Sequence, residues 1–358
     1  MTTPTPPPAQ PASASPGTVF WAILPPRDTL FVTGRDAVRF IDNFQTAKVA
    51  TLVPQTGTEA FFTDGRGQVI ALANIFRAGS VEEGTGTVDG LWIDLPPGLA
   101  GRLRDHLEHY HIREDVEFRD ASADRAGLLI GGPGAAAWLA AGAGASPRLS
   151  ITPPPGRLGH HPARLGGIAV HVAHNDWFGS GGFHLITAAA DRPRLIAWLT
   201  DQGLPEVEAA RLEEWRILAA NPDPADIPDK TLPQELGRDA RAISFTKGCY
   251  LGQETVARLD ALGHVNRRLV TLAIDGSPPA TPAAVMQTTG SIPGGGAPVG
   301  TITSACHSVR LGCTVGLALV QVKALTAAAG TTAPDAGAPF SVEGRGARVV
   351  EPAQEELA

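Results

Sequence analysis

The order of expected strands and helices changes once along the chain, and this change limits the folds that it can adopt. Over residues 28–120, apolar runs with strand spacing alternate with runs of helical spacing, and Asp64-Gly65-Arg66-Gly67 is a strong hairpin turn. The alternation repeats over residues 127–220, whereas after residue 262 only short strands separated by Gly- and Pro-rich loops remain. The sequence therefore predicts the α+β class, with two α+β lobes and a C-terminal β-barrel.

The chain has 358 residues, which is too long for one compact core. A Pro-, Ala- and Ser-rich start predicts a disordered tail. The expected parts are a tail at 1–17, a first α+β lobe at 18–125, a second lobe with a following loop at 126–262, a barrel at 263–350 and a short tail at 351–358.

Composition excludes several classes of function. The net charge is −7 and no long basic run occurs, so we expect no nucleic-acid binding. Three cysteines cannot all pair within the chain, which favours a reducing compartment such as the cytoplasm. The uncharged run Gly127 to Ala145 is mostly Gly and Ala with Pro133 inside it, so we do not expect it to span a membrane. The sequence has no long apolar stripe on an expected helix that would indicate a dimer, so we expect a monomer.

Four motifs imitate binding sites. Gly132, Gly134 and Ala137 have the spacing of a dinucleotide-binding turn, but the acidic residue that this fingerprint requires is missing. Cys306, His307 and Cys313 lack a fourth metal ligand. Two histidine groups are expected to lie on solvated surfaces; they contain His106, His109 and His111, and His160, His161, His171 and His174.

The segment "KGCYLGQETVARL", which starts at Lys247, surrounds one cysteine with chemistry that merits attention. We expect a helix from Gln253, with Glu254 in its first turn and Arg258 four residues later. Cys249 would precede this helix and follow Lys247, and both features favour the thiolate. The alternative, a structural cysteine in a tight loop, stays open on these residues alone.

The same segment resembles the signature of the YgfZ family, K-G-C-aromatic-x-G-Q-E-x-x-x-R, and all seven fixed positions match. "LPQE" and "ISFTKGC" before it and "GHVNRRL" after it also resemble the family, and the likeness covers about residues 28–322. This family comprises folate-binding relatives of the glycine-cleavage T-protein that act in iron–sulfur cluster synthesis or repair. We call Lys247–Arg258 the signature segment; its matching residues are Lys247, Gly248, Cys249, Gly252, Gln253, Glu254 and Arg258, with Tyr250 in the aromatic position.

The resemblance implies a three-lobed ring whose central hole holds tetrahydrofolate, with the Cys249 loop at the rim. Cys249 and Lys247 are the expected reactive pair. The expected folate contacts are Gln45, Thr46, Arg216, Glu235 and Arg267. Expected partners are iron–sulfur client or assembly proteins; with so few cysteines, a resident cluster and metal ligands are not expected.

The chain also departs from the related aminomethyltransferases. Ala71 and Leu72 stand where those enzymes carry an essential Asp, and Leu218 stands where they carry a pterin-binding Glu. Ala47 and Lys48 replace the family's usual Asn and Asp. A conventional enzyme is therefore not expected. Two alternatives to a folate-binding accessory protein remain: a tetrahydrofolate-dependent one-carbon transferase and a folate-free scaffold.

Overall fold

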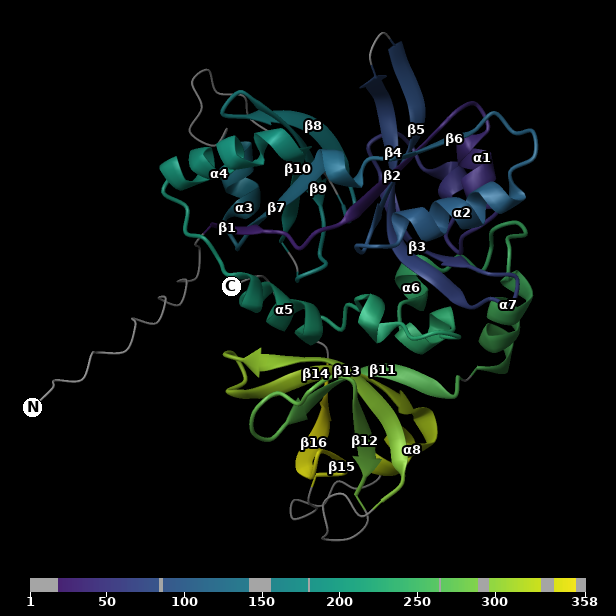
Figure 1. Ribbon diagram of the computed structural model, residues 1–358, viewed down its shortest axis with the longest axis vertical. Coiled ribbons are helices and arrows are strands. Elements are labelled where there is room, and N and C mark those ends of the chain that lie inside the picture. The colour runs from purple at the N-terminus through teal and green to yellow at the C-terminus, as the bar shows by residue number, and fades with distance from the viewer. Residues whose placement is uncertain are drawn as a thin grey trace, which may run out of the picture.

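The computed structural model describes residues 19–83, 86–141, 156–179, 181–263, 265–288, 296–329 and 338–351. Two α+β lobes lie side by side, and a layer of short helices lies between them and a β-barrel (Figure 1). The tail expected at 1–17, and all but the first residue of the tail expected at 351–358, lie outside the described residues. Within these ranges no helix is long and apolar enough to cross a bilayer.

The first lobe is an antiparallel sheet covered on one face by helices. Its strand order is β3-β4-β5-β2-β6. The strands are β2 (Asp28–Thr33), β3 (Gly57–Thr63), β4 (Val69–Glu83), β5 (Gly86–Leu95) and β6 (Glu117–Asp120). The helical elements are α1 (Ala37–Asp42), η1 (Val49–Thr51), α2 (Ala100–Tyr110) and η2 (Ser122–Asp124). The predicted strand–turn–helix start and the hairpin of β3 and β4 are both confirmed.

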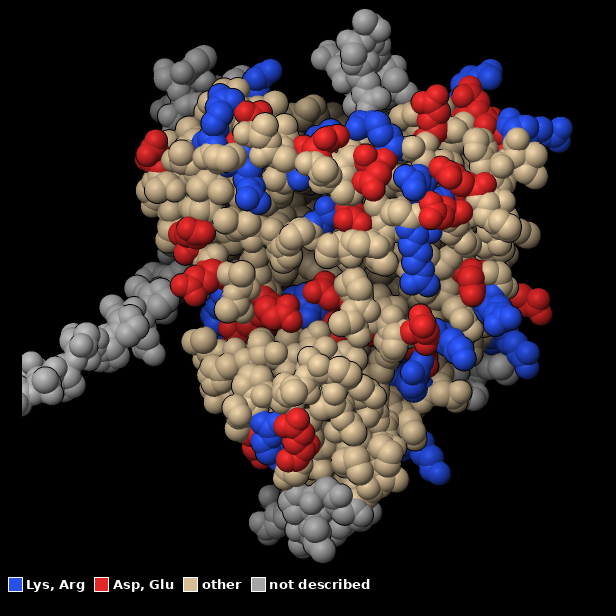
Figure 2. All heavy atoms as spheres, in the orientation of Figure 1, with Lys and Arg blue, Asp and Glu red and all other residues tan. Residues whose placement is uncertain are grey.

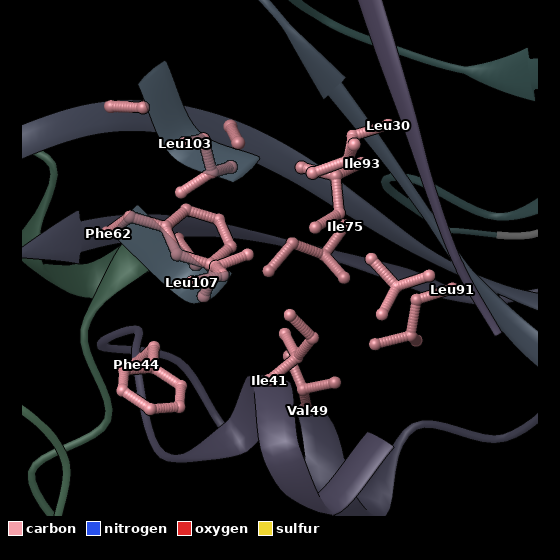
Figure 3. Packing of buried hydrophobic residues seen from close by; sticks show 14 of the residues in the cluster. Leu30, Ile41, Phe44, Val49, Phe62, Ile75, Leu91, Ile93, Leu103 and Leu107 are labelled. Carbon is pink, nitrogen blue, oxygen red and sulfur yellow. The ribbon is translucent and has the colours of Figure 1, made fainter. Parts of the chain in front are cut away.

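Alternation along the strands directs side chains to two different cores. On β2, Leu30 and Val32 face α1 and α2, whereas Phe31 faces the second lobe. Figure 3 shows the first of these cores, where Phe62 and Ile75 of the sheet meet Ile41 of α1. The lobe therefore has one helix-covered face and one face available for the second lobe.

The second lobe is another five-stranded antiparallel sheet, with the order β1-β7-β10-β9-β8. Its strands are β1 (Phe20–Ile23), β7 (Arg125–Gly131), β8 (His160–Leu165), β9 (Ile168–His174) and β10 (Phe183–Ala188). Its helical elements are α3 (Ala135–Ala140), η3 (Ala189–Asp191) and α4 (Arg192–Asp201). The run that imitates a dinucleotide-binding turn forms the end of β7 and the short α3.

One predicted boundary needs correction. We assigned residues 18–125 to the first lobe, but β1 pairs with β7 of the second lobe, with Phe20 opposite Gly131. The chain therefore starts in the second lobe and crosses to the first just before β2. Strand spacing reveals that a run is a strand but not which sheet it joins, so this exchange was not visible in the sequence.

The segment after the second lobe lies between the two lobes and the barrel (Figure 1). It consists of α5 (Ala209–Leu218), η4 (Pro224–Asp226), η5 (Pro233–Leu236), α6 (Asp239–Ala242) and α7 (Gln253–Leu262). The predicted helix from Gln253 is confirmed.

The C-terminal domain is a closed six-stranded barrel, as predicted, with the order β11-β14-β13-β12-β15-β16. Its elements are β11 (Arg267–Ile274), β12 (Ala283–Gln287), β13 (Pro298–Ser308), β14 (Cys313–Gln321), α8 (Val322–Ala329), β15 (Phe340–Val342) and β16 (Arg345–Val350). We did not predict β12 or α8.

The junction of the three lobes is filled by one cluster of buried apolar side chains. Phe61 and Leu72 come from the first lobe, Leu129 from the second, Leu218 from α5 and Leu317 from the barrel. The resemblance implies a central hole between the lobes, and these apolar side chains pack together at that junction. Leu72 and Leu218, the two departures from the aminomethyltransferases, both belong to this cluster.

Candidate functional site

The Cys249 loop, residues 247–252, is fixed to the first lobe by its backbone. The Leu251 amide donates to the carbonyl of Asn43 at 2.9 Å, and the hydroxyl of Thr63 donates to the carbonyl of Leu251 at 2.7 Å. These contacts join the loop to the end of α1 and to the end of β3. The loop is thus presented on a rigid surface rather than on a free linker.

Lys247 anchors this loop from inside. Its ammonium donates to the carbonyl oxygens of Asp42, Gln45 and Ala47 at 2.6, 2.8 and 2.5 Å. Its Nζ also lies 5.2 Å from the centre of the Tyr250 ring. Burial lowers the pKa of Lys247 to about 8. Because an ammonium has three donors, all of them are used. We therefore correct the expectation of a reactive Lys247 beside the thiol: the residue positions the loop.

Cys249 is exposed and carries a free thiol. Cys306 and Cys313 are also free cysteines, but both are partly buried. The helix after Cys249 begins at Gln253, behind the N-cap residue Gly252. Cys249 therefore lies three residues before the N-cap, in the position that the sequence predicted. What the structure gives it is access, because Gly248 beside it is also exposed.

Gly252 permits a close backbone contact that sets the direction of α7. Its φ is +83°, and a Cβ at this position would lie 2.5 Å from the carbonyl oxygen of Asp64. The facing residue of the β3–β4 turn is Gly67, whose own Cβ would lie 2.8 Å from the side chain of Thr255. Two glycines are needed because two backbones meet here. The remaining signature residues follow in α7, where Gln253 is partly buried and Glu254 and Arg258 are exposed.

The expected folate contacts Gln45 and Thr46 are fully buried and are used inside the protein. The amide of Ala47 donates to the Gln45 side-chain oxygen at 2.6 Å. The Thr46 hydroxyl donates to the carbonyl of Ala242 and accepts from the amide of Phe61. Thr46 therefore joins the first lobe to the segment before the Cys249 loop, whereas the Gln45 side chain is used within the first lobe.

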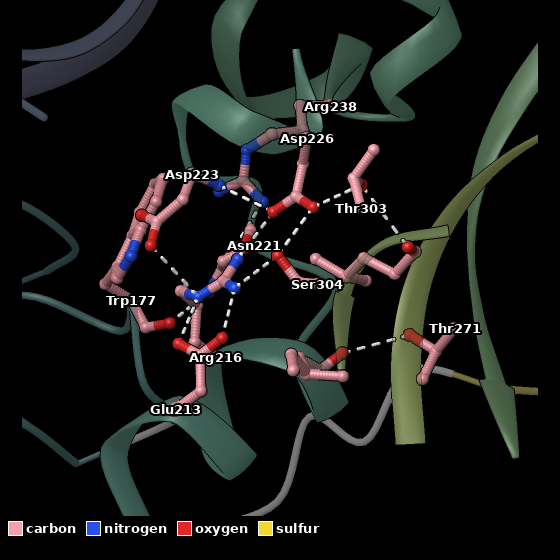
Figure 4. Close-up of polar contacts among 12 residues, drawn as sticks. Trp177, Glu213, Arg216, Asn221, Asp223, Asp226, Arg238, Thr271, Thr303 and Ser304 are labelled. Atoms are coloured by element: carbon pink, nitrogen blue, oxygen red, sulfur yellow. Dashed lines mark hydrogen bonds and ion pairs between the residues drawn. The ribbon is translucent and has the colours of Figure 1, made fainter. Parts of the chain in front are cut away.

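Arg216 is the centre of a buried network between α5 and the barrel (Figure 4). It donates to both carboxylate oxygens of Glu213, at 2.8 and 2.6 Å, to Asp226 at 2.7 Å and to the Ser304 hydroxyl at 2.8 Å. Burial alone would lower its pKa, but the bonds to Glu213 and the charges of Asp223 and Asp226 raise it. Its cation is already compensated by carboxylates of this chain.

Glu235 and Arg267 bind each other. Arg267 donates to the two Glu235 oxygens at 2.9 and 2.8 Å, in a bidentate pair that links η5 to the first barrel strand. The five expected folate contacts are thus dispersed over three structural junctions. None of them is among the residues that line the cavity described next.

A cavity of about 230 Å³ lies between the first two lobes instead. Figure 2 shows the surface hollowed between these lobes, with acidic and basic side chains at its edge. Its polar or aromatic lining residues are Arg27, Thr29, Trp92, Asp94, Ser122, Arg125, His184 and Arg192. No residue of the Cys249 loop lines it, so the structure separates the cavity from the thiol.

Two residues that line this cavity carry a buried nitrogen atom without a hydrogen-bond partner, namely Nε1 of Trp92 and Nε2 of His184. Behind the lining residue Asp94, Asn74 donates from Nδ2 to Asp94 at 3.3 Å, and its Oδ1 also has no partner. Burial lowers the pKa of His184 to about 3, so its imidazole is neutral. With two aromatic N–H groups, a carboxylate and nearby arginines, the residues fit a flat ring that has both donors and acceptors, joined to an anionic tail. A pterin with a glutamate tail is such a molecule.

Sequence reasoning missed these lining residues. Arg27 and Asp94 are single polar residues at strand ends, in "PPRD" and "LWIDLP", and neither pattern distinguishes a site from a strand end. They meet only because the chain crosses between the two sheets. Among the described residues, no group of three or more His, Cys, Asp and Glu side chains is placed to hold a metal ion.

Comparison with known proteins agrees with this architecture. Residues 267–353 match the model of the glycine cleavage T-protein C-terminal barrel domain. The glycine cleavage system aminomethyltransferase T from Bartonella henselae superposes with a TM-score of 0.71 at 16% identity, over 95% of this chain and 86% of that one. This likeness concerns the fold alone.

Two curated relatives narrow the family. The chain is 27% identical over 264 residues to the mitochondrial iron–sulfur cluster assembly factor IBA57 homolog of Chaetomium globosum. The aligned region covers 70% of this chain and 55% of that protein. The chain thus spans a little over half the length of this relative. The chain is also 60% identical over 42 residues to the tRNA-modifying protein YgfZ of Colwellia psychrerythraea. This shorter aligned region covers 12% of this chain and 13% of that protein. The barrel, the three-lobed fold and these relatives together support a protein of the YgfZ/IBA57 type with a glycine-cleavage T-protein-like fold.

Proposed function

We propose that this protein is a folate-binding accessory factor for the synthesis or repair of iron–sulfur clusters in client enzymes, and that it acts through Cys249. The observation that carries the proposal is an exposed thiol on a loop that Lys247 fixes to the first lobe. A thiolate is a good ligand for iron, and a fixed, accessible one suits transfer to or from a partner protein. Relatives named as iron–sulfur cluster assembly factors support this role.

The thiol acts as a single, transient ligand in this proposal. A stable cluster usually needs four thiolates, and the chain has three cysteines, two of them on the barrel. The partner protein therefore supplies the other ligands. Free thiols suit a reducing compartment, and we propose that the protein works in one, such as the cytoplasm.

We further propose that the cavity between the lobes, rather than the residues expected from the sequence, holds the folate. Asp94 would accept from the amino edge of the pterin, and the N–H groups of Trp92 and His184 suit its carbonyl oxygen. Arg125 and Arg192 line the same cavity and provide positive charge for the tail carboxylates. When bound, a reduced folate supplies a carrier for a one-carbon unit.

The thiol is tested in cells that lack this protein. Cys249→Ser should fail to restore the activity of iron–sulfur enzymes under oxidative stress, whereas Cys313→Ser should restore it. Cys313 is the matched control, because it is also a free cysteine but lies on the barrel. Full restoration by Cys249→Ser would refute the role of the thiol.

The folate site is tested separately by calorimetric titration with folinic acid. We expect saturable binding by the wild type and by Cys249→Ala, because no loop residue lines the cavity. Asp94→Asn should weaken binding. No binding by the wild type would exclude the folate part of the proposal and leave a folate-free scaffold that presents the Cys249 loop.

A further inference from the structure

Arg27 lies between the cavity and the ring of Trp177. Its side chain lines the cavity, and its guanidinium carbon lies 5.6 Å from the centre of the Trp177 ring. Its Nε donates to Oδ1 of Asp94 at 2.7 Å. Trp177 is buried and is not among the residues that line the cavity. The guanidinium of Arg27 therefore contacts the Trp177 ring and forms an ion pair with the Asp94 carboxylate at the same time.

Trp177 is held in place independently of Arg27. Its amide donates to the side chain of Asn175 at 2.9 Å, and its carbonyl accepts from Asn221. Arg238 also lies over its ring, at 5.4 Å, and is itself bound to Glu59. Movement of Arg27 would therefore expose an indole whose position is already fixed.

The chemistry of Arg27 matches one edge of a pterin. A guanidinium is planar, presents N–H donors on neighbouring nitrogens, pairs with carboxylates and stacks on aromatic rings. The aminopyrimidinone edge of a pterin is also planar and also presents two neighbouring N–H donors. Asp94 and Trp177 are the partners that either group would use.

We propose that Arg27 is an internal occupant of the ligand site, and that it must leave Asp94 and Trp177 before a pterin ring can bind fully. This inference rests on the proposed folate site. The cavity of about 230 Å³ is smaller than typical small-molecule sites, which start at roughly 300 Å³. Movement of Arg27 would join the cavity to the Trp177 face and enlarge it. Affinity in the wild type is then reduced by the fraction of molecules in which Arg27 has moved.

Titration with folinic acid tests this proposal, with the wild type beside Arg27→Met and Arg192→Met. We expect Arg27→Met to bind about tenfold more tightly than the wild type, which corresponds to about 1.4 kcal/mol. Arg192→Met removes the same charge from the same cavity but exposes no aromatic ring, so it should bind equally or more weakly. If Arg27→Met binds as the wild type does or more weakly, Arg27 is not an occupant.

Titration with pterin, which lacks the glutamate tail, shows whether the gain in affinity of Arg27→Met arises at the ring or at the tail. The gain in Arg27→Met should appear for pterin as well, because the proposed competition concerns the ring. A gain confined to folinic acid would place the effect at the tail and overturn the proposal.

A second variant protects the test against misfolding, because Arg27→Met leaves the buried carboxylate of Asp94 without its cation. Arg27→Lys keeps that ion pair but not the planar stack, and should bind a few-fold more tightly than the wild type. Equal binding by Arg27→Lys and the wild type would refute the competition. If neither the wild type nor any variant binds folinic acid, the proposed folate site fails, and this inference fails with it.

Discussion

The buried carboxylate of Glu59 makes a quantitative prediction about how the lobes are joined. Glu59 lies on β3 of the first lobe and is fully buried. Arg238 binds both of its oxygens, one at 2.7 Å, and Arg157 of the second lobe binds it as well. Burial alone would raise the pKa of Glu59, but the charges of Arg238 and Arg157 hold it below its ordinary value.

Glu59→Gln removes the negative charge and leaves the Arg238 guanidinium buried without a counterion. Breaking a buried pair in this way costs about 3–5 kcal/mol, a large part of the roughly 5–15 kcal/mol that holds a protein folded. We expect urea unfolding at neutral pH to show this loss. The exposed Glu254→Gln is the matched control and should change the unfolding free energy by less than about 0.5 kcal/mol.

The same variant has a signature in acid. Because the folded pKa of Glu59 is depressed, its contribution is present above its ordinary value of 4.5 and is lost as the pH falls through the folded value. Glu59→Gln should therefore lose less stability than the wild type on acidification below that range. A loss of less than about 1 kcal/mol at neutral pH would show that the arginines find other partners and would refute the reasoning.

Three further predictions concern other parts of the molecule. Lys247→Met should lower the unfolding free energy by about 3 kcal/mol, because three carbonyl oxygens lose a charged donor. It should also speed amide hydrogen exchange in the Cys249 loop, and unchanged exchange would contradict the positioning role of Lys247. Gly252→Ala should cost more stability than Gly263→Ala, since both have positive φ but only Gly252 would meet a backbone oxygen; equal thermal shifts would contradict this. Burial lowers the pKa of His160 to about 4 and of His171 to about 3. The unfolded chain therefore binds protons first as the pH falls below 6.5, and stability should decrease from there toward pH 4, as urea midpoints at pH 7 and pH 5 would show.

The architecture could be read from local patterns to a large extent. Strand spacing in "TLFVT" and the Asp64–Gly67 turn predicted the first strand and hairpin, and the Gly- and Pro-spaced strands after residue 262 predicted the barrel. These patterns are reliable because alternation and turn chemistry act between neighbouring residues. The joining of β1 to the second sheet depends on pairing with a strand about a hundred residues away, and no local pattern encodes it.

The sequence predicted less of the candidate site than of the fold. The signature segment identified the family and the Cys249 loop, because glycines, an aromatic residue and a cysteine at fixed spacing form one continuous motif. The sequence also suggested that Arg216 and Lys247 were available cations. The folded chain surrounds Arg216 with carboxylates and Lys247 with carbonyls, so neither charge is free to meet a ligand.

The sequence by itself determined the order of the lobes, the closed barrel and the loop that carries the thiol, since each is encoded in consecutive residues. The tertiary structure decided which charges are neutralised, where the cavity opens and that Arg27, Asp94 and Trp177 meet. These three residues lie far apart in the chain. Their meeting depends on how two sheets pack, which is a property of long-range contacts that single residues do not reveal.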